Sequence, residues 1–161
     1  MKTKLLAIYL NDHLAGSAAG VELCRRLQAR NSEQSELGEP LAELCEEIEA
    51  DREILMRLMD QLGVRRGTVK PAAAWIAEKL GRLKLNGQVT GYSPLSRLVE
   101  IEGLAIGITG KMEMWRALER TLGPSQSGFD FDQLAERAVR QRDRAEDLHA
   151  IAARQALPSP R

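Results

Sequence analysis

Residues 40–63, PLAELCEEIEADREILMRLMDQLG, carry the most regular helical pattern in the chain. Apolar side chains recur every three or four residues, which places them on one face of an α-helix. Pro40 suits the first helical turn, and Gly63 suits the position just beyond the last turn. Asp51 occupies a position within the apolar face. We therefore predict an amphipathic helix whose core-facing stripe consists of Leu41, Leu44, Ile48, Leu55, Leu58 and Leu62.

Three further segments repeat this period without an internal proline, and they cover residues 4–29, 93–123 and 130–157. Ser93 can cap the second of them, because serine side chains accept a hydrogen bond from the first turn. Asp130 can cap the third, since a glutamine follows three residues later as in a capping box. Each helix is about 40 Å long at 1.5 Å per residue. We predict an all-α protein with four long helices.

The connections set the expected topology. The first and last pairs of helices are joined by short loops and should be antiparallel, whereas residues 64–92 are long enough to span the bundle. The result is an up-down-down-up bundle, predicted to form a single domain over residues 1–157 with a frayed tail at 158–161. The crossover is expected to contain a short amphipathic helix at residues 71–85, with an apolar stripe of Ala73, Ile76, Leu80 and Leu83.

The stretch AEDLHA places Glu146 and His149 one helical turn apart. With the four-helix pattern, this Glu-x-x-His pair resembles the ferritin-like superfamily. In that family two helices each supply a Glu and two supply a Glu-x-x-His to a pair of metal ions. The resemblance implies an iron or manganese site. Its candidate ligands are Glu146 and His149, with Glu102 near the inward edge of the third helix and Glu46 of the second, whereas Glu100 should point away.

That ligand pattern is incomplete, because only the last helix carries a histidine of this kind. The interpretation that we favour is therefore a non-catalytic scaffold or partner-binding bundle with a degenerate metal site, and a metal-binding ferritin-like protein is the alternative. In the scaffold interpretation, Glu146 and His149 are ordinary structural residues. The metal-binding and scaffold interpretations differ in one observable, which is bound metal.

Estimated heights along the helices bring His13, Asp51 and Arg142 to one level of the bundle. A buried aspartate needs a partner, since an unpaired charge in a core costs several kcal/mol. We predict that Arg142 and His13 pair with Asp51 in a buried polar layer that fixes helix register. A divalent-metal site that uses His13 and Asp51 is the alternative.

The third helix is apolar on both faces, so it should be covered on both. Gly103, Gly107 and Gly110 lie on its second face and would let another helix approach closely, although glycine costs about 1 kcal/mol per residue in a helix. We predict that the crossover helix covers part of this face and that a homodimer contact covers the rest. Glycines tolerated on a solvent face are the alternative.

The chain as a whole has no strong electrostatic field, because 23 basic residues balance 23 acidic ones. Neither nucleic acid nor a membrane is therefore expected as a partner. The crossover is locally basic and could hold an anionic ligand, or it could pair with the acidic second helix.

Cys24 and Cys45 are expected to lie near one another as buried free thiols in a cytoplasmic protein, with a redox pair as the alternative. No other catalytic motif is present.

Overall fold

The computed structural model describes residues 2–67, 92–123 and 128–157. Within these ranges the chain forms four helices and no strand. The helices are α1 (Lys2–Asn31), α2 (Gly38–Gln61), α4 (Pro94–Leu122) and α5 (Phe131–Ala156). The predicted all-α class with four long helices is confirmed. The predicted crossover helix at residues 71–85 and the tail at 158–161 lie outside the described residues.

The helix ends follow from local side-chain chemistry. The Ser93 hydroxyl accepts a hydrogen bond from the Ser96 amide at 3.1 Å, and the Asp130 carboxylate accepts one from the Gln133 amide at 2.9 Å. Both side chains satisfy amides that have no partner within the first helical turn. Gly63 adopts a positive φ of 64° just beyond α2, where its missing side chain avoids strain. The sequence therefore specifies these boundaries locally.

A tight connection joins α1 to α2. The amide of Gln34 donates to the carbonyl of Asn31 at 2.9 Å, so the chain turns as soon as α1 ends. At Gly38 an added Cβ atom would lie 2.7 Å from the carbonyl oxygen of Ser32. Only glycine fits this approach without a backbone shift.

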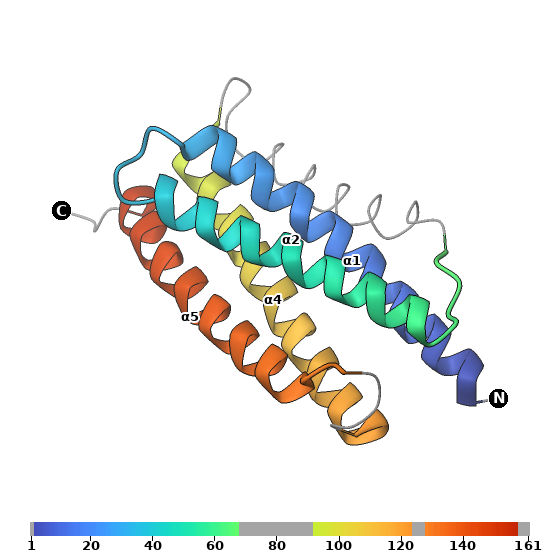
Figure 1. Cartoon of the computed structure of the whole chain (residues 1–161). Coiled ribbons are helices and arrows are strands. Elements are labelled where there is room, and N and C mark those ends of the chain that lie inside the picture. Colours follow the sequence, from blue (N-terminus) through green and yellow to red (C-terminus); the bar gives the residue numbers. More distant parts are fainter. Residues whose placement is uncertain (1, 68–91, 124–127, 158–161) are drawn as a thin grey trace.

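Figure 1 shows α1 and α5 running in one direction and α2 and α4 in the other. α1 packs against α2 and α4, and α5 packs against the same two helices. At one end of the bundle Arg97 of α4 donates to Asn31 of α1 and to Gln155 of α5, each at 2.6 Å. Three helices are thus fastened together by one guanidinium group. No helix of the described ranges combines the length and the apolar character that crossing a membrane requires.

The core consists of two apolar clusters. One cluster lies toward the Arg97 end of the bundle and contains residues such as Leu27, Leu44 and Leu148. The other lies toward the opposite end and contains Trp115 and Phe131, whose rings are 6.2 Å apart. Burying each such side chain contributes about 1.5–3 kcal/mol relative to leaving it in water. The boundary between the clusters falls at the polar side chains described next.

Candidate functional site

A buried polar layer separates the two apolar clusters. Its centre is Asp51 of α2, whose residue surface is only 1% exposed. Arg137 of α5 donates to one carboxylate oxygen of Asp51, and Lys111 of α4 donates to the other. Gln141 of α5 is fully buried and donates to Asp51 at 3.1 Å, while its own oxygen accepts from Lys111. The layer therefore joins three helices through one carboxylate.

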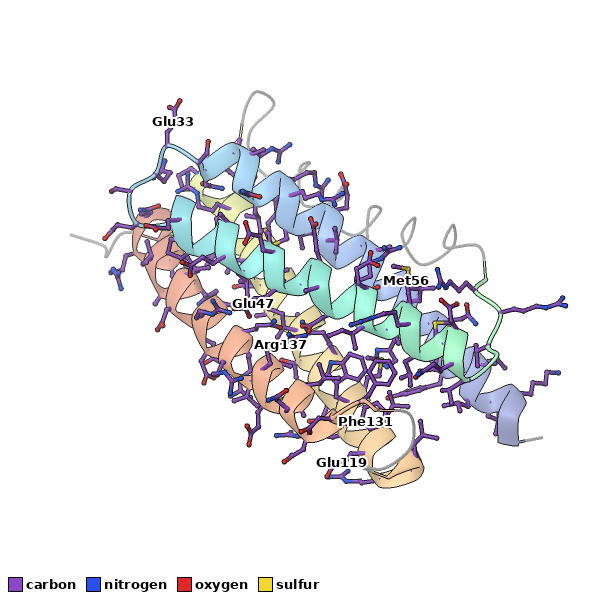
Figure 2. All side chains as sticks on the ribbon, in the orientation of Figure 1. Glu33, Glu47, Met56, Glu119, Phe131 and Arg137 are labelled. Carbon is purple, nitrogen blue, oxygen red and sulfur yellow. A yellow bond between two sulfur atoms is a disulfide. The ribbon has the colours of Figure 1, made fainter. Side chains whose placement is uncertain are left out.

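The layer continues toward the surface between α2 and α5. Gln141 Nε2 also donates to Glu47 Oε2 at 3.0 Å, and Arg144 donates to the same oxygen. Arg144 lies 3.9 Å from Glu43 as well. Figure 2 shows Glu47 and Arg137 in this region between the two helices. Three acidic and three basic side chains thus balance one another, namely Glu43, Glu47 and Asp51 against Lys111, Arg137 and Arg144.

Burial and pairing shift two of these groups in pKa. Desolvation raises the pKa of Glu47, but hydrogen bonds from Arg144 and Gln141 outweigh it and hold the pKa below its usual value. Desolvation lowers the pKa of Lys111, and the neighbouring Asp51 only partly opposes this effect. Both carboxylate oxygens of Asp51 accept hydrogen bonds from cations, so the layer offers no set of free lone pairs to a metal ion.

The predicted partners of Asp51 are wrong. Arg142 follows Gln141 and is rotated about 100° around α5, as one residue step requires. It pairs instead with Asp143 at 2.9 Å and with Glu146 at 3.5 Å. The spacing of Arg137, Gln141 and Arg144 on one helical face was the sequence signal that could have identified the true partners.

His13 forms no hydrogen bond to Asp51. Its ring packs edge-on against Tyr9, with centroids 4.6 Å apart. Burial lowers the pKa of His13, and the nearby Asp12 carboxylate only partly opposes it. His13 and Asp51 nevertheless line one pocket.

Only two of the four predicted metal ligands meet. His149 Nε2 lies 3.0 Å from Glu102 Oε1 on the surface between α5 and α4. Glu146 pairs with Arg142, and Glu46 is exposed on α2. In the part of the chain that the structure describes, no three His, Cys, Asp or Glu side chains are placed to share a metal ion. The predicted four-ligand set is therefore wrong as a cluster.

The two glutamates at the start of α4 are placed opposite to the prediction. Glu100 is buried and lies 3.3 Å from Arg30 of α1, whereas Glu102 is exposed. Because α4 is apolar on both faces, its sequence period does not fix which face points inward. The inward-facing glutamate thus belongs to an ion pair with α1 and not to the predicted site.

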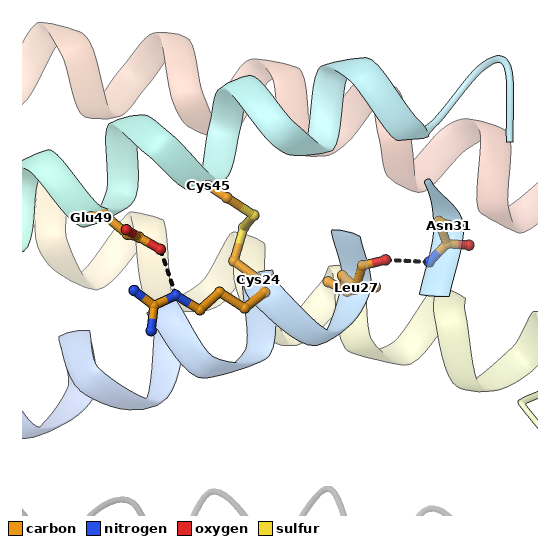
Figure 3. The surroundings of a disulfide bond; sticks show 6 residues. Cys24, Leu27, Asn31, Cys45 and Glu49 are labelled. Carbon is orange, nitrogen blue, oxygen red and sulfur yellow. Dashed lines mark hydrogen bonds and ion pairs between the residues drawn. A yellow bond between two sulfur atoms is a disulfide. The ribbon is translucent and has the colours of Figure 1, made fainter. Parts of the chain in front are cut away.

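A disulfide links Cys24 of α1 to Cys45 of α2, with Cα atoms 5.5 Å apart (Figure 3). The prediction of free thiols is wrong, although the expectation that the two residues lie close together is confirmed. Beside the disulfide, Arg25 Nε donates to Glu49 Oε1 at 2.6 Å. The bridge and the ion pair both hold α1 against α2.

A pocket of about 230 Å³ lies where α1, α2 and α4 meet. Two glycines of α1 and three of α4 line it, and these include the three glycines predicted to admit another helix. Of residues 2–67, 92–123 and 128–157, a Cβ atom added at Gly107 or Gly110 would meet none within 4 Å, while one at Gly103 would meet Leu23 at 3.6 Å. Among the described residues, then, the glycine face borders a space instead of a closely packed helix.

The basic crossover is described only at its start. Arg65 and Arg66 are exposed, and Arg66 pairs with Asp60 of α2. The remaining basic residues of that segment lie outside the described ranges, so the anionic-ligand prediction there is unchanged.

Comparison of the chain with protein-family models, with curated proteins and with solved structures gave no match.

Proposed function

We propose that this chain is a non-catalytic helical-bundle protein that binds a partner, with a ferritin-like arrangement and a degenerate metal site. The observation that carries the proposal is the charge-balanced layer around Asp51. Carboxylates at such a level of a ferritin-like bundle would be available to metal ions. Here the central carboxylate is already neutralised by Lys111 and Arg137.

Energetics supports the same conclusion. A metal ion at Asp51 would have to displace Lys111 or Arg137, which would leave a cation without its partner in a largely apolar interior. Uncompensated buried charges of this kind cost several kcal/mol. The donor set also lacks the histidines that would complete a di-metal site, since His13 faces Tyr9. The residues of the layer therefore do not fit iron or manganese.

The test is metal content per chain, measured by elemental mass spectrometry. The protein would be purified aerobically and then loaded anaerobically with Fe(II) or Mn(II), beside an Asp51→Asn variant treated in the same way. We expect no stoichiometric metal in the wild-type chain after desalting. One or two ions per wild-type chain that disappear in Asp51→Asn would contradict the proposal.

The second candidate function is metal binding at the surface pair of Glu102 and His149. The observation that favours it is their separation of 3.0 Å, which is close enough for both to contact one ion. Glu146 could join them only after leaving Arg142. On this interpretation Arg142→Ala should increase metal binding and His149→Ala should abolish it, while both variants keep wild-type helicity.

We propose a second copy of the chain as the partner. Support comes from Ile106 of α4, which is 73% exposed and does not belong to the lining of the pocket between α1, α2 and α4. A large apolar side chain of this exposure gains free energy when a partner removes it from water. Sedimentation velocity should show a dimer that Ile106→Glu dissociates, whereas Leu157→Glu, also at an exposed apolar position, should leave it intact. A monomeric wild-type chain would exclude this partner.

The predicted cytoplasmic location and the disulfide favour different compartments. Disulfides persist mainly in oxidising compartments, whereas cytosolic thiols are usually kept reduced. Rapid alkylation of intact cells, followed by non-reducing electrophoresis, distinguishes the two. Fully alkylated Cys24 and Cys45 would agree with the cytoplasmic prediction, and a protected pair would replace it with an oxidising location.

A further inference from the structure

The pocket between α1, α2 and α4 exists because glycines replace side chains along its wall. Gly16 and Gly20 of α1 and Gly107 and Gly110 of α4 line it, and an added Cβ at any of the four would meet none of the described residues within 4 Å. Glycine is also less favourable than alanine inside a helix. Within the described part of the chain, packing therefore leaves room for larger residues at these four positions, yet each of them is glycine.

The inner wall of the pocket is apolar. Buried side chains of α2 and α4 form it, namely Ile48, Leu55, Leu104, Ile108 and Met114. An engineered cavity of about 150 Å³ accommodates benzene, so a space of about 230 Å³ takes on the order of ten non-hydrogen atoms. The pocket thus suits a small molecule with a hydrocarbon body.

Two polar groups of the lining have no partner. Trp115 is 0% exposed and its indole Nε1 has no hydrogen-bond acceptor among the described residues. The Nε atom of Arg52 is likewise buried without an acceptor in that part of the chain. A buried donor that loses water and gains no acceptor destabilises the fold. Both residues line the pocket, so these two donors indicate a ligand that carries hydrogen-bond acceptor atoms.

The charged side chains of the lining indicate which kind of acceptor group the ligand carries. Asp51 and Lys111 also line the pocket, but each is already paired with the other in the polar layer. Arg52 forms no ion pair with any residue that the structure describes, and His13 has its pKa lowered by burial. Among the described residues, Arg52 is therefore a lining cation without an acidic partner, which favours an anionic head group.

We propose that this pocket binds a small amphipathic carboxylate of medium chain length. Its carboxylate accepts hydrogen bonds from the Arg52 guanidinium, and the Trp115 indole supplies a further donor. Its hydrocarbon body packs against the leucine, isoleucine and methionine side chains of α2 and α4. The glycines of α1 and α4 provide the space that the body fills.

Octanoate is the probe, and Trp115 is the reporter. The chain has two tryptophans, so a Trp75→Phe background leaves Trp115 as the only one. Titration should change the Trp115 emission with a saturable, one-to-one dependence that calorimetry reproduces. Octan-1-ol has a similar body without the charge and should bind about tenfold more weakly or worse, because hydrogen bonds to a charged group are stronger than those to a neutral one. Octylamine should not bind.

Two variants test separately the contact with the head group and the room for the hydrocarbon body. Arg52→Gln should abolish the preference for octanoate over octan-1-ol without abolishing binding of the alcohol. Gly107→Leu should block both ligands while it preserves helicity, since an added Cβ there meets no residue of the described ranges within 4 Å. The matched control is Ala150→Leu, at an exposed position of α5 outside the pocket, and it should bind octanoate like the parent.

Three results would overturn the proposal. The first is no saturable octanoate binding to the full-length chain at millimolar concentration. The second is octanoate binding that Gly107→Leu leaves unchanged, which would place the ligand elsewhere. The third is a pocket closed by a second copy, in which case Gly107→Leu would shift the sedimentation coefficient and the wild-type chain would not take up octanoate. The metal measurements above are independent of all three results.

Discussion

Arg137 of α5 donates a hydrogen bond to the carboxylate of Asp51 on α2, across a sequence separation of 86 residues. The aspartate is 1% exposed, whereas the arginine side chain is 29% exposed and retains some contact with water. A single carboxylate inside the bundle is thereby tied to a cation that reaches in from the edge. Lys111 completes the arrangement from α4.

Removing the aspartate should destabilise the fold strongly. Asp51→Ala leaves Lys111 and Arg137 without their shared partner, and breaking a buried ion pair costs about 3–5 kcal/mol. The free energy of unfolding from urea denaturation should fall by about that amount. As a control, Glu53→Ala removes an exposed carboxylate from the same helix and should change it by less than about 0.5 kcal/mol. Equal effects of the two substitutions would show that the layer contributes nothing specific.

Acid should weaken the fold through Glu47. Its pKa is lower in the folded protein than in the unfolded chain, so its contribution is present above the unfolded pKa and is lost as the pH falls through the folded pKa. The unfolded value is about 4.3, which places the loss below about pH 5. Glu47→Gln should therefore reduce the acid dependence of the urea midpoint in that range. An unchanged acid dependence would assign it to other carboxylates.

Reducing the disulfide should lower stability with little loss of helix. The bridge closes a loop over a sequence separation of 21 residues, for which the chain-entropy model gives about 3 kcal/mol. Cys24→Ser with Cys45→Ser should reproduce the effect of reductant on the unfolding midpoint. Circular dichroism should show native helicity in both cases. A midpoint that reductant does not move would mean that the thiols are not joined in the purified protein.

Two glycines should respond to alanine with opposite signs. Gly38→Ala places a Cβ atom 2.7 Å from a backbone oxygen, so the turn between α1 and α2 must shift and stability should fall. Gly107→Ala meets none of the described residues within 4 Å and should raise stability by about 1 kcal/mol, because alanine favours the helix. Thermal unfolding of the pair measures both effects. A loss of stability at Gly107 would reveal a close neighbour of that glycine.

Sequence reasoning succeeded where the determinants are local. Helix periods and the caps at Ser93 and Asp130 involve residues a few positions apart, so they can be recognised without a structure. It failed for the partners of Asp51, because these depend on how three helices rotate about their own axes. One residue step along α5 turns a side chain by about 100°. A helix rotation that is wrong by this amount points Arg142 toward Asp51 in place of Arg137.

The same limit explains the other errors. α4 is apolar on two faces, so its pattern could not show that Glu100 points inward and Glu102 outward. Whether Cys24 and Cys45 bond depends on the mutual rotation of α1 and α2, which spacing along the chain does not determine. The pocket was missed for a different reason. The pocket exists because glycines have no side chain to fill the space. The donors of Trp115 and Arg52 beside it can be recognised as lacking an acceptor among the described residues only once their burial is known.

The division of the core by the polar layer has a consequence for how the bundle opens. Apolar packing is interrupted at Asp51, so each half can lose its contacts without first dismantling the other. Amide protons in the half that contains Trp115 and Phe131 should exchange with solvent before those of the other half. The latter contains Cys24 and Cys45 and is held together covalently. The bundle would then open from the end that contains Trp115 and Phe131. Reducing the disulfide would make the amide exchange rates of the two ends similar.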